Sequence, residues 1–306
     1  MFSFLHVNPE VTITLDENAE MNQKLEVFAP DLKMPCFSGT DKISGKLVIT
    51  PPPGKVVGHK GIVLSVFGEY RGENNQVLSR FFSRNQSLMP PGDLATEYTH
   101  EFSFDSMNMP TSTYFGTTVN VVYGVELRII HRISDFVVEK QFIVLNFAEP
   151  KPSEPIHNEV GIRNILHVEF IFPKANYDVG ECVVGAAYFI LVRLRIVFMG
   201  ISLYRNETYE SDSTFLKKRT LLKNYDVLDG APVRGDHIPI RVFMGESNIW
   251  PYQQYSGSPL AVEHYLRIEM VDENNKKYFK RMKLNFDRYE PKVVKSVNEL
   301  DDDFKD

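Results

Sequence analysis

The chain has 306 residues, of which 43% are hydrophobic and 24% charged, a mixture typical of a soluble globular protein. Its 34 Lys and Arg against 40 Asp and Glu give a formal net charge of −6. This balance argues against a nucleic-acid-binding protein, because such proteins carry an overall basic surface. The length favours two domains of about 150 residues each.

The two cysteines, Cys36 and Cys182, are too few for a disulfide framework and therefore indicate a reducing compartment. The chain begins MFSFLHVNPEV, which has neither the basic region nor the long apolar region of a signal peptide. The sequence has no run approaching about 18 apolar residues, so no membrane-spanning segment is predicted. We therefore expect a cytosolic protein.

Apolar and polar residues alternate with a period of two along much of the chain, which predicts half-buried β-strands with one wet face. Residues 118–130 show the pattern best, and 191–196 and 264–272 repeat it. The residues that share the inner face of the first stretch are Val119, Val121, Tyr123, Val125, Leu127 and Ile129. Only residues 211–223 approach a helical period, and a short helix there is the alternative left open. Many short strands separated by Gly/Pro turns predict an all-β protein built of antiparallel sandwiches.

The predicted boundary between the two domains is AEPKPSEP (148–155), where three prolines hold the chain extended and cannot donate ladder hydrogen bonds. The predicted units are an N-terminal sandwich (1–150), a linker (151–158), a C-terminal sandwich (159–293) and an acidic tail expected to be disordered (294–306).

The two halves resemble one another. An aromatic residue and two glycines, Phe37, Gly39 and Gly45, lead into one apolar strand, and Tyr177, Gly180 and Gly185 lead into another. In each half a strand pair, a polar or Gly-rich segment and a long alternating strand follow. We interpret the order of elements as a duplication.

The stretch YDVLDGAPVRGDHIPIRVFM (225–244) places Asp226 and Asp229 in a Gly/Pro-rich bend with Arg234 nearby. Such groups could act as acid and base, bind a metal or phosphate, or shape a surface for another protein. Aspartates in bends commonly accept backbone hydrogen bonds, so structural aspartates are favoured over a catalytic pair.

Other candidate sites are weak. His167 and Glu169 share a strand face, but two ligands without a third favour a surface hydrogen bond over a metal site. Cys182, in an apolar strand, is predicted to be an inert core residue. No catalytic residue, metal or cofactor is therefore predicted. The basic cluster at 276–283 interleaves Tyr278 and Phe279, and we expect its charges outside and its aromatic rings inside.

Several stretches of the C-terminal half resemble a known family. They are EVGIRNILHVEFIF (159–172), CVVGAAYFILVRLRI (182–196), residues 225–244 and KKYFKRMKL (276–284). Four more follow in order in the N-terminal half: ISGKLVI (43–49), GHKGIVLSVFGE (58–69), LMPPGDL (88–94) and residues 114–144. The chain is similar to the vacuolar protein sorting 26 family, the arrestin-like subunits of retromer, over nearly its whole length.

The resemblance implies two arrestin-like β-sandwiches in tandem and a non-enzymatic role. The family subunit docks on the N-terminal end of the α-solenoid subunit, vacuolar protein sorting 35, and through it joins the metallophosphoesterase-like subunit. With sorting nexins it helps select the cytosolic tails of transmembrane cargo for retrieval from endosomes to the Golgi or plasma membrane. The implied location is cytoplasmic and peripheral on endosome membranes, without nucleic acid.

The resemblance also implies two binding sites. The solenoid contact falls on Val227, Leu228, Asp229, Gly230, Ala231, Pro232, Val233, Arg234 and Gly235. Here apolar anchors, a loop fixed by glycines and proline, and a planar guanidinium would suit a protein interface. The alternative is that Val227 and Leu228 are buried in their own domain. A pocket for an extended cargo tail falls on Val160 and Phe279, where a strand edge would pair with the peptide.

One departure concerns a partner. Family members that bind a PDZ-containing sorting nexin carry an acidic Asp-Gly pair before their SGK strand. Here residues 37–41 read Phe-Ser-Gly-Thr-Asp, which argues against that contact. Two other function classes stay open. One is an arrestin-type adaptor that binds receptor tails outside retromer, and the other is a carbohydrate- or lipid-active sandwich enzyme with a deep polar pocket.

Overall fold

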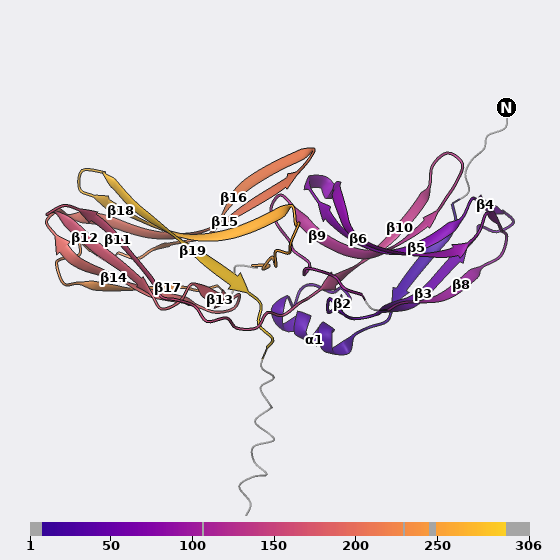
Figure 1. Cartoon of the computed structure of the whole chain (residues 1–306), viewed down its shortest axis with the longest axis horizontal. Coiled ribbons are helices and arrows are strands. Elements are labelled where there is room, and N and C mark those ends of the chain that lie inside the picture. The colour runs from indigo at the N-terminus through magenta and orange to yellow at the C-terminus, as the bar shows by residue number, and fades with distance from the viewer. Residues whose placement is uncertain (1–7, 106, 229, 245–248, 292–306) are drawn as a thin grey trace, which may run out of the picture.

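The computed structural model describes residues 8–105, 107–228, 230–244 and 249–291. The chain forms two β-sandwiches that lie end to end along the long axis of the molecule (Figure 1). The strands are almost all antiparallel, so the predicted all-β fold of two tandem sandwiches is confirmed. The predicted tail (294–306) lies outside the described residues, and the exact domain limits stay a prediction.

The N-terminal sandwich packs a three-stranded sheet on a five-stranded sheet, with a two-stranded ribbon at one side. The first sheet has the order β1 (Glu10–Leu15), β3 (Ile43–Thr50), β8 (Tyr98–Phe104). The second has the order β2 (Cys36–Phe37), β10 (Phe136–Val144), β9 (Asn120–Ile129), β5 (Ile62–Arg71), β6 (Val77–Met89). The ribbon pairs β4 (Val57–His59) with β7 (Gly92–Leu94), and a 3-10 turn, η1 (Glu73–Asn75), joins β5 to β6.

The C-terminal sandwich packs a four-stranded sheet on a five-stranded sheet. The first sheet has the order β11 (Ile156–Ile162), β12 (Leu166–Phe172), β14 (Val183–Val192), β17 (His237–Val242). The second has the order β13 (Asn176–Asp178), β19 (Lys277–Asp287), β18 (Leu260–Asp272), β15 (Ile196–Ser211), β16 (Thr214–Asp226). β11 begins inside the predicted 151–158 linker.

The two five-stranded sheets have matching strand orders. In each, a short strand pairs in parallel with the last strand of its half, β2 with β10 and β13 with β19, and the remaining strands follow in the same sequence. Two corresponding glycines, Gly45 in β3 and Gly185 in β14, also lie close to other atoms. A Cβ on Gly45 would lie 2.1 Å from the Thr14 carbonyl oxygen, and a Cβ on Gly185 would lie 2.5 Å from the Phe172 ring. The repeated strand order supports the predicted duplication.

Two local predictions are wrong, and one open alternative is decided. Residues 211–223 form the tip and outer strand of the β15–β16 hairpin and not the alternative helix, because Ser211 pairs with Thr214 and the pairing continues down both strands. Residues 191–196 alternate inward and outward as predicted, but β14 ends at Val192 and the chain crosses between sheets before β15 begins at Ile196. Cys182 lies just before β14 and is partly exposed, whereas Cys36 is buried, and burial raises the pKa of the Cys36 thiol to about 12.

One helix, α1 (Ala19–Phe28), was not predicted. Its amphipathic pattern is short, since only Met21 and Leu25 are buried. The Asn18 side chain caps the helix by accepting a hydrogen bond from the Met21 N–H, at 3.1 Å. The helix lies below the N-terminal sandwich near the junction of the two halves (Figure 1).

A buried polar interface joins the sandwiches. The Glu207 carboxylate on β15 accepts hydrogen bonds from the Tyr114 hydroxyl at 2.5 Å and from the backbone N–H groups of Thr117 and Thr118 at 2.9–3.1 Å. Arg205 lies 3.2 Å from the same carboxylate. Residues of the C-terminal half also pack into the N-terminal core: Tyr209, Trp250 and Leu260. The two halves therefore share part of one core.

Candidate protein-docking site

The predicted solenoid contact forms the loop between β16 and β17. Gly230 and Gly235 adopt φ values of 88° and 91°, a region that residues with a Cβ rarely occupy. A Cβ at either position would meet no atom within 4 Å. These glycines are therefore needed for the path of the backbone and not for close packing.

Backbone hydrogen bonds fix both ends of the loop. The Val227 N–H donates to the Met199 carbonyl at 2.9 Å, and Gly235 donates to the Phe189 carbonyl at 2.8 Å. Phe189 in turn donates to the Asp236 carbonyl at 2.9 Å, and the Asp236 side chain accepts from the Val233 N–H at 2.8 Å. The loop thus presents its side chains from a base held on β14 and β15.

The loop borders a surface hollow of about 420 Å³. Val227 and Leu228 line it and are only half-buried, since they also pack on the C-terminal core. Val233 and Arg234 do not line the hollow and stand in solvent, Val233 with 61% of its surface exposed. Asp229 lies outside the described residues. The other lining residues are Gly230, Ala231, Pro232, Gly235, Asp236, His237, Ile238 and Pro239.

Residues 236–239 line the hollow but were not predicted as part of the site, although they directly follow the predicted residues in sequence. The hollow is lined mainly by apolar side chains and backbone, and its carboxylate, Asp236, is engaged with the loop. Such a surface suits a protein partner that inserts an apolar side chain, and it does not assemble an acid–base pair.

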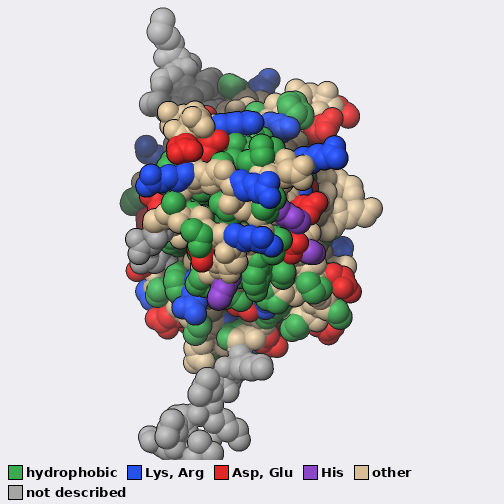
Figure 2. Space-filling view, turned by 90° about the vertical axis from the view of Figure 1, so that its left-hand side faces the viewer, with side chains coloured by type: hydrophobic (Ala, Val, Ile, Leu, Met, Phe, Trp, Pro, Cys, Tyr) green, Lys and Arg blue, Asp and Glu red, His purple; other side chains and the backbone are tan. Residues whose placement is uncertain are grey.

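The surrounding surface of the C-terminal sandwich mixes apolar and basic side chains. Figure 2 views the molecule from this end and shows hydrophobic side chains between Lys and Arg side chains. Exposed apolar residues of the four-stranded sheet and its edge include Ile171, Val184, Tyr188, Ile190 and Phe243. Contiguous apolar residues with a charged surround are common where proteins associate.

The predicted cargo-tail residues lie on the edges of the two C-terminal sheets. Val160 is on β11, an outer strand of the four-stranded sheet, and Phe279 is on β19, where β13 covers only residues 285–287. β11 and β19 are in contact with each other. Val160 is partly buried against the C-terminal core, whereas Phe279 is 55% exposed. The backbone of β19 before residue 285 is therefore a sheet edge.

The prediction that both aromatic residues of the basic cluster point inward is wrong. Tyr278 is buried and its hydroxyl donates to the Asp272 carboxylate at 2.8 Å, but Phe279 points to the outer face. Neighbouring residues of a strand point to opposite faces, so only one of the two can be inside. The guanidinium groups of Arg267 and Arg281 lie 5.2 and 5.9 Å from the Phe279 ring.

His167 and Glu169 do lie on one exposed face, as predicted. His167 Nε2 is 3.1 Å from Glu159 and 3.4 Å from Glu169, and His157 is 3.2 Å from Glu169. In the described ranges no group of three or more His, Cys, Asp or Glu could hold a metal ion. Within the same ranges, no helix has the length and apolar character needed to cross a membrane.

The segment before the SGK strand is engaged internally. The Asp41 carboxylate accepts hydrogen bonds from the Ser38 N–H at 2.8 Å, the Ser38 hydroxyl at 2.7 Å and the Asn18 amide at 2.8 Å. This carboxylate thus closes a turn on its own chain.

Comparison with known proteins identifies the family. A family model described as vacuolar protein sorting-associated protein 26 matches residues 6–275. The chain belongs to the vacuolar protein sorting-associated protein 26 family. A protein of that name from Plasmodium falciparum (isolate 3D7) is 31% identical over 279 residues, which cover 89% of this chain and 94% of the relative.

Two further relatives agree. The Caenorhabditis elegans protein of the same name is 32% identical over 249 residues, covering 80% of this chain and 69% of the relative. Vacuolar protein sorting-associated protein 26B of Arabidopsis thaliana is 32% identical over 261 residues, which cover 83% of this chain and 85% of the relative. Membership of the family supports a role in vacuolar protein sorting. The family's arrestin-like architecture agrees with the two sandwiches.

Proposed function

We propose that this chain is a non-enzymatic retromer subunit that docks through the loop at 227–235 on the α-solenoid subunit, vacuolar protein sorting 35. The observation that carries the proposal is the loop itself, a hollow lined in part by apolar side chains, beside exposed Val233 and Arg234 on a hydrogen-bonded base. The proposed partner is the one that the resemblance to the family implies. In this role the chain acts with sorting nexins on endosome membranes, where it lies peripherally on the cytoplasmic side.

The physical basis of docking is the burial of apolar surface at a preformed site. Because both ends of the loop are fixed before binding, little conformational entropy is lost when a partner covers the hollow. Arg234 can donate two parallel hydrogen bonds to a carboxylate on the partner. An apolar centre with a charged edge is the usual anatomy of a specific interface.

The double variant Val227→Asp/Leu228→Asn should weaken binding to the solenoid subunit at least thirtyfold, equivalent to about 2 kcal/mol, because carboxylate and amide groups replace central apolar anchors. Isothermal titration calorimetry with the purified solenoid subunit measures the change. Both residues also pack on the core, so Val233→Asp, at a position with 61% of its surface exposed, serves as a second variant that should change folding stability little.

The matched control is Val77→Asp, an exposed valine of the N-terminal sandwich, which should leave the affinity unchanged. Wild-type affinity in both loop variants would refute the docking site. Binding of receptor-tail phosphopeptides without any binding of the solenoid subunit would support the arrestin-type adaptor instead.

We further propose that an extended cargo tail pairs with the edge of β19 that β13 leaves uncovered, beside β11. The exposed side chain of Phe279 lies on this part of β19. Substituting Phe279→Asp should weaken binding of a cargo-tail peptide about tenfold, measured by fluorescence polarisation in the presence of the sorting nexin. Phe215→Asp, at another exposed phenylalanine, is the control. Equal affinities for the two variants would rule out this edge as the peptide site.

A further inference from the structure

Arg288 is a buried cation for which the described residues offer no hydrogen-bond acceptor. It is 2% exposed, and its Nε, Nη1 and Nη2 atoms all lack a partner. Buried charges are normally paired, since leaving one unpaired costs several kcal/mol. Burial lowers the pKa of Arg288 to about 9, which is still well above neutral, so the group stays charged at pH 7.

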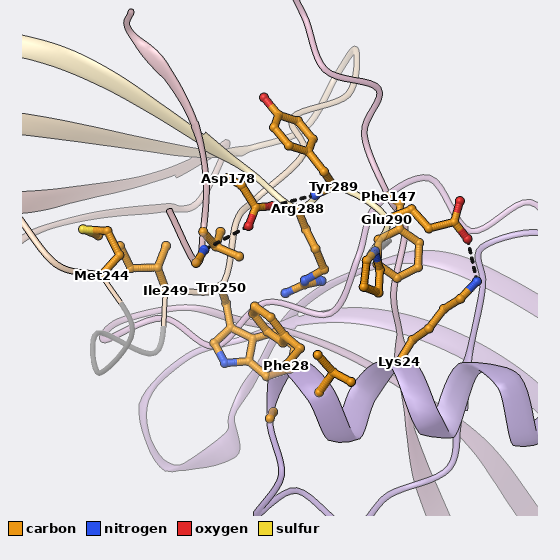
Figure 3. Close-up of a pocket in the computed structure, with 15 residues that line it drawn as sticks. Lys24, Phe28, Phe147, Asp178, Met244, Ile249, Trp250, Arg288, Tyr289 and Glu290 are labelled. Atoms are coloured by element: carbon orange, nitrogen blue, oxygen red, sulfur yellow. Dashed lines mark hydrogen bonds and ion pairs between the residues drawn. The ribbon is translucent and has the colours of Figure 1, made fainter. Parts of the chain in front are cut away.

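The neighbouring charged groups are already engaged. The Asp178 carboxylate accepts hydrogen bonds from the backbone N–H groups of Tyr289 at 2.9 Å and Gly180 at 3.1 Å. The Lys24 ammonium lies 2.7 Å from Glu20 and 2.6 Å from Glu290. Figure 3 shows the two Asp178 contacts and the Lys24–Glu290 ion pair around the same cavity. Among the described residues, Arg288 is thus the cation of this cavity that has no carboxylate partner.

Aromatic rings hold the guanidinium in place. Its central carbon lies 3.8 Å from the centroid of the Phe28 ring and 5.1 Å from that of Trp250. The two rings meet edge to face at 5.2 Å, and Phe115 packs against Trp250 at 4.7 Å. Cation–π contacts stabilise the faces of a guanidinium but leave the N–H groups on its edge unused.

Arg288, Phe28 and Trp250 line a cavity of about 480 Å³ at the junction of the sandwiches. The volume is within the range of small-molecule sites, roughly 300–1,000 Å³. Its walls come from the end of α1, the chain after β13, and the segments around Trp250 and Arg288. The Arg288 side chain points toward the Phe28 and Trp250 rings (Figure 3). The apolar lining residues are Val27, Phe28, Ala29, Phe147, Val179, Met244, Ile249, Trp250 and Pro291.

We propose that this cavity binds a small amphipathic monocarboxylate, with its carboxylate on the edge of Arg288 and its apolar body against Phe28, Trp250 and Ile249. A guanidinium can donate two parallel hydrogen bonds to one carboxylate. A single anionic group is favoured over a phosphate because one cation of the cavity lacks a carboxylate partner, while Asp178 and Glu290 would repel a dianion.

The site is independent of the proposed docking loop. None of its lining residues belongs to residues 227–235, and Arg288 lies beyond the residues that the family model matches. Its occupancy would fix α1 of the N-terminal half against the C-terminal half.

Trp250 is the single tryptophan of the chain, so its fluorescence reports directly on this cavity. Titration of the full chain with decanoate, below its micelle concentration, should give a saturable change in emission on excitation at a wavelength selective for tryptophan. Decan-1-ol has the same chain without the carboxylate and should bind at least tenfold more weakly. Equal binding of the two probes, or no binding of decanoate, would overturn the proposal.

Arg288→Met keeps the aliphatic stem and removes the charge, and it should abolish decanoate binding measured by calorimetry. Its midpoint of thermal unfolding should equal or exceed that of the wild type, because an unpaired buried charge has been removed. Arg163→Met, at an exposed turn, is the control and should bind normally. Undiminished binding to Arg288→Met would contradict the site, and tighter binding of decyl phosphate than of decanoate to the wild type would overturn the assignment of a monocarboxylate.

Discussion

Replacing Glu207 by alanine is expected to lower the free energy of unfolding by about 3–5 kcal/mol, because it leaves a buried interface with unpaired groups. The carboxylate is 1% exposed and serves the Tyr114 hydroxyl, the N–H groups of Thr117 and Thr118, and the Arg205 cation at once. Without it, an arginine that is 8% exposed keeps its charge without a counter-ion at the junction. Urea denaturation followed by Trp250 fluorescence measures the loss.

The matched control for Glu207 is Glu210→Ala on the same strand, whose side chain is exposed. This change should cost less than about 0.5 kcal/mol, as exposed substitutions usually do. A loss below about 1 kcal/mol for Glu207→Ala would show that water replaces the carboxylate at the junction. In that case the polar interface would not hold the two sandwiches together.

Strands with one wet face were predictable from sequence alone. The inner face predicted for residues 118–130 is fully buried, with Val121, Tyr123, Val125, Leu127 and Ile129 each at 0% exposure. Burial of one face is the physical cause of alternation, so the pattern reports it directly. A helix of three turns with two buried residues, such as α1, has too little periodicity to be detected in this way.

The opposite face of the same strand shows what the pattern cannot report. Glu126 was expected on the wet face, yet it is 6% exposed, because Arg80 at 2.9 Å and Arg128 at 3.1 Å cover it. Burial alone would raise the pKa of this carboxyl, but the hydrogen bonds from both arginines hold the pKa of Glu126 below its ordinary value. Arg80 reaches it from β6, a relation set by tertiary pairing and invisible in local sequence.

The loop at 227–235 could be recognised in the sequence as a continuous motif, and the cavity around Arg288 could not. Residues 227–235 are neighbours in sequence, so their glycines and apolar side chains could be recognised together. How far Val227 and Leu228 are buried depends on their packing against the C-terminal core, which only the structure shows. Phe28, Trp250 and Arg288 come from three distant segments, and each alone has an ordinary surrounding sequence.

Acidification should destabilise the chain through His264. This histidine on β18 is 4% exposed, and among the described residues its Nε2 has no hydrogen-bond partner. Burial and, to a smaller extent, the neighbouring Arg205 cation together lower the pKa of His264 to about 3. Its ordinary pKa is about 6.5, so below that pH the unfolded chain binds a proton that the folded chain does not. The stability is complete above pH 6.5 and is lost as the pH falls toward 3.

Linkage then gives a loss of about 2 kcal/mol at pH 5 and about 3 kcal/mol at pH 4, relative to pH 7.5. His264→Leu should remove this contribution, so its free energy of unfolding in urea should change less between pH 7.5 and 5 than that of the wild type. His59 also has a lowered pKa caused by burial and acts in the same direction, so the difference between the two proteins isolates His264. Most carboxyl groups titrate below this window. Identical pH dependence in the two proteins would mean that folded His264 gains a proton near its ordinary pKa, which requires water or a rearranged Arg205 inside the sandwich.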